Sequence, residues 1–318
     1  MIKITSVKFH SNFPIANTSK KAKEVKDKSS FENNLKTTNF KGIAVAMHPI
    51  VSNMAREVYD KTFDEMAKLT QQNFYINLVK PTLHYKMRDN DDASYVPNTN
   101  TVILNIKHLG RRNCAITSIP DEYFPGDGGT FGIMWNKGKL ERLKSNSRYA
   151  NLAERKADLA INFAHELAHA RQMQVGLSLP NGKEIIAEEI RKKPIFEKYE
   201  VREIVEELEK DFSFIKNFEP QKNLATKYRL PNYQDGSFKY SAEDILRNLF
   251  SYNDSSDKSN YAQIAEIDAN LATIEFIEES LLKVVPELSE EGKEKFWQEH
   301  GVLLLKSLDD LTNAQEQK

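Results

Sequence analysis

The chain has 318 residues, of which 40% are hydrophobic and 29% are charged, and its formal net charge is −1. This length allows one large domain or two small ones with a real core, and so balanced a charge gives no overall field that attracts nucleic acid or anionic lipid. A nucleic-acid partner is therefore not expected. No apolar run approaches the roughly 18 residues that a membrane-spanning helix needs, so a membrane span is not expected either.

The beginning of the chain is polar. Residues 2–9 alternate like a short strand, but up to about residue 36 lysines are interspersed with Ser, Asn and acidic residues, which is typical of a mobile, solvated arm. We therefore expect residues 1–39 to form a partly disordered N-terminal arm and residues 40–318 to fold. Because the apolar core of a signal peptide is missing, a cytoplasmic location is expected, although secretion by another route is not excluded.

Strand patterns come early in the folded part, and helix patterns follow. Residues 42–70 have the period of an amphipathic helix, with a break or a new start at Pro49. Strands are predicted at residues 74–79, 82–87, 101–106 and 114–119, and at the end of the glycine-rich stretch 125–135. Helices are predicted at residues 183–191, 196–218, 242–252, 264–282 and 288–311. This order predicts an α+β fold with a small mixed sheet in the N-terminal half and a mostly helical C-terminal half.

Residues 165–169 read His-Glu-Leu-Ala-His, within a stretch at 151–175 that is rich in Ala and Leu and predicts a helix ending at Gly176. Residues four apart share a helix face, so His165 and His169 have the spacing at which two imidazoles bind one zinc ion. Glu166, rotated by about 100°, can reach a water molecule at the metal without being a ligand. This HExxH arrangement makes Glu166 the expected general base.

A catalytic zinc ion usually takes three protein ligands. Since Cys114 is the only cysteine, the third ligand is expected to be a carboxylate, and the best candidate is Glu266, which small alanines flank on a predicted helix. Asn270, one turn beyond Glu266, is expected to support the site by hydrogen bonding. The rival ligands are Glu184, Glu188 and Glu189, and a weaker one is Asp268, which should face away from Glu266.

The pair of motifs, His165-Glu166-x-x-His169 followed by Glu266-x-x-Ala269-Asn270, resembles the gluzincin group of zinc metallopeptidases, in particular the ImmA/IrrE-type and lethal-factor-like peptidases. The resemblance implies a zincin-like catalytic domain at residues 40–318, with a helical insertion at about 183–260 and C-terminal helices. It also implies a sheet whose edge strand, at residues 95–106 or 129–135, binds the substrate backbone. A tyrosine that stabilises the oxyanion would be Tyr261, or else Tyr252.

These features predict a zinc-dependent metallopeptidase that hydrolyses peptide bonds in a peptide or protein substrate through a zinc-activated water, with Glu166 as base. One alternative is a binding or scaffold protein that keeps a zincin fold without turnover. Another is a helical interaction protein in which the motif is a coincidence. The sequence does not indicate an oligomeric state.

Overall fold

The computed structural model describes residues 44–47, 49–86, 93–105, 130–136, 139–144, 152–221, 240–251 and 263–316. The expected N-terminal arm at residues 1–39, the expected strand at 114–119 and the two tyrosines, Tyr252 and Tyr261, lie outside these residues.

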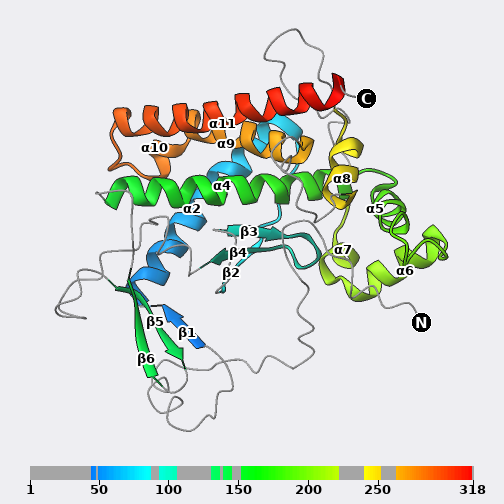
Figure 1. Ribbon diagram of the computed structural model, residues 1–318, viewed down its shortest axis with the longest axis horizontal. Coiled ribbons are helices and arrows are strands. Elements are labelled where there is room, and N and C mark those ends of the chain that lie inside the picture. The colour runs from blue at the N-terminus through cyan, green and yellow to red at the C-terminus, as the bar shows by residue number, and fades with distance from the viewer. Residues whose placement is uncertain are drawn as a thin grey trace.

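The fold is built around α4 (Leu152–Leu177), a long helix that crosses the middle of the molecule in Figure 1. α9 (Ile264–Glu279) packs along one side of α4, and α11 (Glu290–Glu316) covers α9 in turn. A small mixed sheet lies on the opposite side of α4, and α2 (Pro49–Phe74) crosses behind α4. This arrangement confirms an α+β fold in which helices dominate the C-terminal half.

Two small sheets come from the N-terminal half. In the sheet next to α4 the strand order is β2-β4-β3, where β2 (Thr82–Lys86) runs parallel to β4 (Thr101–Asn105) and β3 (Ala93–Val96) runs antiparallel to it. β3 is therefore an edge strand of this sheet, and it contacts α4. The second sheet is antiparallel, with β5 (Thr130–Asn136) between β1 (Ala44–Met47) and β6 (Lys139–Lys144).

The segment between the first helix and the sheet departs from the prediction. The expected helix at 42–70 begins only at Pro49, whose fixed φ suits the first turn, and β1 precedes it. The expected strand at 74–79 is wrong, because side chains replace a strand partner there. Gln174 on α4 accepts from the Val79 amide at 2.8 Å and donates to the Val79 carbonyl at 2.9 Å. Gln221 does the same for Asn77, at 2.8 and 2.9 Å.

Close packing also decides where α4 ends. Gly176 was expected just past the helix, but α4 continues to Leu177. A Cβ atom on Gly176 would lie 2.7 Å from a methyl carbon of Leu246 on α8 (Ala242–Ser251). Its lack of a side chain therefore lets α8 approach α4, and the residue does not serve as a helix cap.

The remaining helices follow the prediction with shifted bounds. α5 (Gly182–Arg191) is confirmed, and the charged region after it forms α6 (Val201–Asp211) and the short α7 (Ser213–Asn217). Ser241 and Asp244 cap α8 reciprocally, because each side chain accepts a hydrogen bond from the backbone amide of the other. The predicted helix at 264–282 is divided at Ser280 into α9 and α10 (Leu281–Val284).

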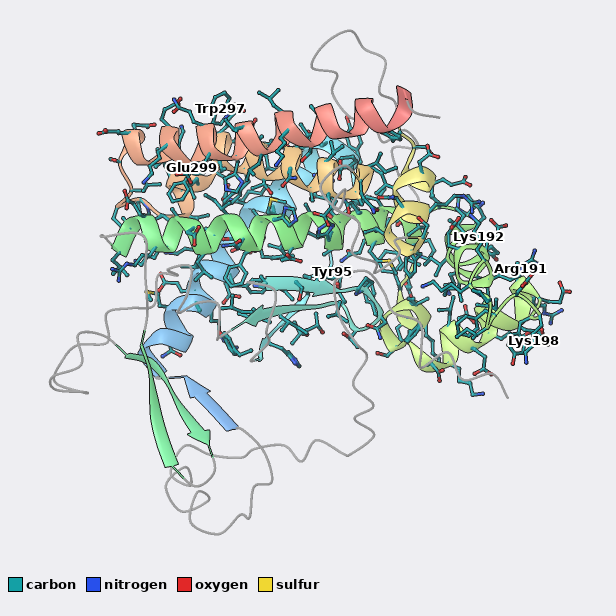
Figure 2. The ribbon with its side chains drawn as sticks, viewed as in Figure 1. Tyr95, Arg191, Lys192, Lys198, Trp297 and Glu299 are labelled. Atoms are coloured by element: carbon teal, nitrogen blue, oxygen red, sulfur yellow. The ribbon has the colours of Figure 1, made fainter. Side chains whose placement is uncertain are left out.

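The last helix turns a different face inward from the one predicted. The spacing of Trp297, Val302, Leu305 and Leu308 predicts one apolar stripe on this helix. Of these four, Leu308 packs against the core, but Val302 is 67%, Leu305 52% and Trp297 37% exposed, whereas Phe296 and Leu304 are buried. Figure 2 shows Trp297 on the side of α11 that faces away from α4. Within the described residues, none of the helices combines the length and the apolar character that crossing a bilayer requires.

Candidate metal centre

One face of α4 carries polar side chains, and the rest of the helix is packed. From Ala157 to Leu177 the helix is buried except at a few half-buried positions. Apart from the adjacent pair at 165 and 166, these positions follow one another in steps of three or four residues, which places them along one side of the helix. They are Asp158, Asn162, His165, Glu166 and His169. His165, Glu166 and His169 are therefore half-buried on a helix that is otherwise packed.

The structure brings a third side chain to the two histidines. Nε2 of His165 lies 3.3 Å from Oε2 of Glu266, and Nε2 of His169 lies 3.5 Å from Oε1 of the same carboxylate. The two imidazole rings are 4.9 Å apart between centroids and nearly perpendicular, with 87° between their planes. Glu266 comes from the first turn of α9, which packs along α4.

This geometry fits a single small metal ion. One donor atom from each of His165, His169 and Glu266 lies within 4.8 Å of the other two. Ligand atoms at about 2.1 Å from a tetrahedral zinc ion lie about 3.4 Å from one another, which agrees with the two nitrogen–oxygen distances. Two imidazoles and one carboxylate are also a donor set that zinc accepts at sites where one position stays open. Among the described residues, these three form the one group of His, Cys, Asp or Glu side chains close enough together to hold an ion.

The charge state of Glu266 suits a ligand. Burial alone would raise the pKa of its carboxyl group. When the two imidazoles are protonated, the charge of His169, together with the hydrogen bond and the charge of His165, outweighs burial and lowers the pKa of Glu266 to about 2. At neutral pH the side chain is therefore a carboxylate, the form that binds metal ions.

A buried polar network connects the site to both helices. Oε1 of Gln172 lies 2.9 Å from Nδ1 of His169, and Nε2 of Gln172 donates to the Ala265 carbonyl and to Oδ2 of Asp268, both at 2.7 Å. Arg171 donates to the same Asp268 oxygen at 3.0 Å. Gln172, which the sequence did not indicate, thus makes the hydrogen bond with His169. The supporting role of Asn270 stays a prediction.

The sequence pattern missed Gln172, although its position three residues after His169 places it on the same helix face. Asp268, the weaker rival, lies outside the donor group, but it is buried and takes part in the network through Gln172.

The rival carboxylates have other partners. Glu188 and Glu189 on α5 both form ion pairs with Arg247 of α8, at 2.8 and 3.0 Å. Glu184 lies in the first turn of the same helix and is exposed. The structure thus brings Glu266 to the histidines and uses the α5 carboxylates to bind α5 to α8.

Replacing Glu266 with alanine is expected to weaken zinc binding by more than the roughly 10–100-fold that the loss of an outer hydrogen-bond partner causes, because a direct donor is removed. Zinc affinity would be measured by competition with a chromophoric chelator. The matched control is Glu188→Ala, since the Glu188 side chain is 45% exposed and lies outside the group. Glu189 is unsuitable because its side chain is only 1% exposed and its loss would disturb the fold. Equal affinities in the two variants would contradict the choice of Glu266.

Two other predictions meet the structure in part. The range 95–106 holds only the last two residues of the edge strand β3 and all of β4, which lies between β2 and β3. In the alternative range 129–135, β5 also lies between two strands of its own sheet. Neither predicted range is therefore an edge strand, and the edge strand that contacts α4 is β3 at Ala93–Val96. Tyr261 and Tyr252 lie outside the described residues, so an oxyanion donor stays a prediction.

No protein-family model matches the chain, and neither does any curated protein or solved structure. The chemistry of the site is therefore the basis on which a function can be proposed.

Proposed function

We propose that the protein is a zinc-dependent metallopeptidase of zincin-like fold, with His165, His169 and Glu266 as ligands. The observation that carries the proposal is the meeting of these donor atoms from two helices, within 4.8 Å of one another, directly beside Glu166. A purely structural zinc site has its coordination closed by protein ligands and needs no base beside it. The group is half-buried, which suits a site that receives a substrate.

When bound, zinc supplies a Lewis acid that lowers the pKa of a water molecule towards about 7 and polarises the scissile carbonyl. Glu166 accepts the proton of the attacking water and transfers it to the nitrogen of the leaving amine. Glu166 suits this role because it follows His165 directly, so it lies beside the donor group without belonging to it. The rest of α4 is packed, so these side chains are held on a rigid backbone.

The substrate class proposed is an extended peptide or a protein segment. β3 supports this, because an edge strand offers backbone groups to which a substrate strand can pair. Tyr261 is proposed as a donor to the oxyanion, from the resemblance of the two motifs to gluzincins.

The test is a paired measurement of metal content and peptide turnover on the full chain. About one zinc per chain is expected for a mononuclear site. The double variant His165→Ala, His169→Ala should contain no stoichiometric zinc and should be inactive. Zinc that persists in this variant would place the site elsewhere. A parent protein that binds zinc but cleaves no member of a peptide library would instead favour the binding or scaffold protein.

A further inference from the structure

Gln172 occupies a central place between the histidine helix and the glutamate helix. It is buried, with 1% of its surface exposed. Its amide group contacts His169 on its own helix and two positions of α9, the Ala265 carbonyl and the Asp268 carboxylate. Ala265 precedes Glu266 directly, so the same amide touches one proposed ligand and the residue next to another.

The donors and acceptors of this network allow only one arrangement. A backbone carbonyl and a carboxylate can only accept hydrogen bonds. The Gln172 atom at 2.7 Å from both must therefore be the amide nitrogen, which has two protons to give. Arg171 donates to the same Asp268 oxygen, as expected of a carboxylate. The carbonyl oxygen of Gln172 is thus left to face His169.

The orientation of Gln172 in turn determines where His169 carries its proton. An amide oxygen is an acceptor, so Nδ1 of His169 must be the donor across the 2.9 Å contact. A neutral imidazole carries one proton, and Nε2 then has a free lone pair. Nε2 is the atom that lies 3.5 Å from Glu266, on the side of the donor group.

We propose that Gln172 is a positioning residue that holds His169 in the Nδ1–H tautomer, with Nε2 ready for a metal ion, and that Asp268 with Ala265 determines the orientation of its amide. The tautomer part stands on the hydrogen bonds alone, whereas the effect on metal binding rests on the proposed function. Through the same amide, Gln172 also ties the backbone beside Glu266 to α4, so that one side chain sets the positions of two donors.

The tautomer can be read without any metal. The full chain would be labelled with ¹⁵N-histidine, freed of metal with a chelator and studied by long-range ¹H–¹⁵N correlation at about pH 8, where an ordinary histidine is neutral. A His169→Asn spectrum assigns the signal among the seven histidines. We expect the parent to carry its proton on Nδ1. Gln172→Met should lose this preference, because a thioether is only a weak acceptor for the Nδ1 proton.

Zinc affinity tests the consequence. Gln172→Met should bind zinc about 10–100-fold more weakly than the parent, which is the usual effect of removing an outer hydrogen-bond partner. The matched control is Gln174→Met, because Gln174 is also buried on α4 but bonds to Val79, away from the site. It should leave both the tautomer and the affinity unchanged.

The outcomes separate the two proposals. An Nε2–H tautomer in the parent, or an unchanged tautomer in Gln172→Met, would overturn the role of Gln172 even if zinc binds. A shifted tautomer with unchanged zinc affinity would overturn its role in metal binding. Failure of the parent to bind zinc would instead refute the proposed function, while the tautomer would still decide the part played by Gln172. If Gln172→Met does not fold, the spectrum of the parent carries the test, because an Nε2–H tautomer there overturns the role of Gln172.

Discussion

Replacing Glu166 with glutamine is expected to lower the rate of peptide hydrolysis by about 10²–10⁴-fold, the contribution of a positioned general base. The substitution keeps the shape of the side chain and removes its ability to take a proton. Because Glu166 is not one of the three donors, zinc content should stay at the level of the parent. The loss should appear in kcat, measured with saturating peptide, because proton transfer belongs to the chemical step.

The matched control for this variant is Glu154→Gln, about three turns earlier on the same helix and outside the donor group. It should retain the activity of the parent. If Glu166→Gln cleaved peptides within a few-fold of the parent rate, Glu166 would not be the general base. The presence of Glu166 would then no longer be an argument for the enzyme over the scaffold protein. Loss of zinc from Glu166→Gln would show instead that the side chain supports the metal site.

Replacing Asp268 with alanine is expected to lower the free energy of unfolding by about 3–5 kcal/mol, because it leaves the charge of Arg171 buried without its carboxylate. The two side chains are only 4% and 7% exposed, and their charged atoms are 3.0 Å apart. Arg171 also stacks over the ring of Phe74, at 4.9 Å, which keeps it in place on the core side of α4. Urea denaturation of the metal-free chain, followed by circular dichroism, measures the change.

A double variant, Arg171→Met with Asp268→Leu, separates two effects on the free energy of unfolding. One is the destabilisation caused by removing Asp268 alone from beside the buried charge of Arg171, and the other is the net contribution of the ion pair. Replacing both partners of a buried ion pair by apolar residues is often neutral, so the double variant should be more stable than Asp268→Ala. The double variant also removes a partner of Gln172, so part of the cost will remain. If both variants were equally unstable, the loss would come from packing or from Gln172 and not from the removal of the Asp268 carboxylate beside the charge of Arg171.

The expected donor group was recognisable because helix geometry relates residues that are close in sequence. The i, i+4 spacing predicts that His165 and His169 share a face, and the small residues beside Glu266 favoured a close approach of its helix. The structure brings all three side chains together, although Glu266 and the histidines lie on different helices. Metal binding itself stays a prediction.

Errors arose where the deciding partner is remote in sequence. Gly176 has the composition of a helix end, but its role comes from Leu246, which no local pattern reveals. On α11, apolar residues occur on more than one face, so periodicity cannot choose between the stripe with Trp297 and the one with Phe296. The segment at residues 74–79 has the composition of a strand, but glutamine side chains take the hydrogen bonds that a neighbouring strand would make.

The donor group comes from two helices, α4 and α9, that are far apart along the chain. Gln172 on α4 and its partner Asp268 on α9, for example, are 96 residues apart. Each helix can form early from local contacts, but their docking requires closure of a long loop, which is slow and non-local. A partly folded chain with native helix content would therefore lack the site. If zinc binds as proposed, it would bind only the docked form and would shift the folding equilibrium towards the native state by mass action. The thermal stability of the protein would then depend on zinc concentration.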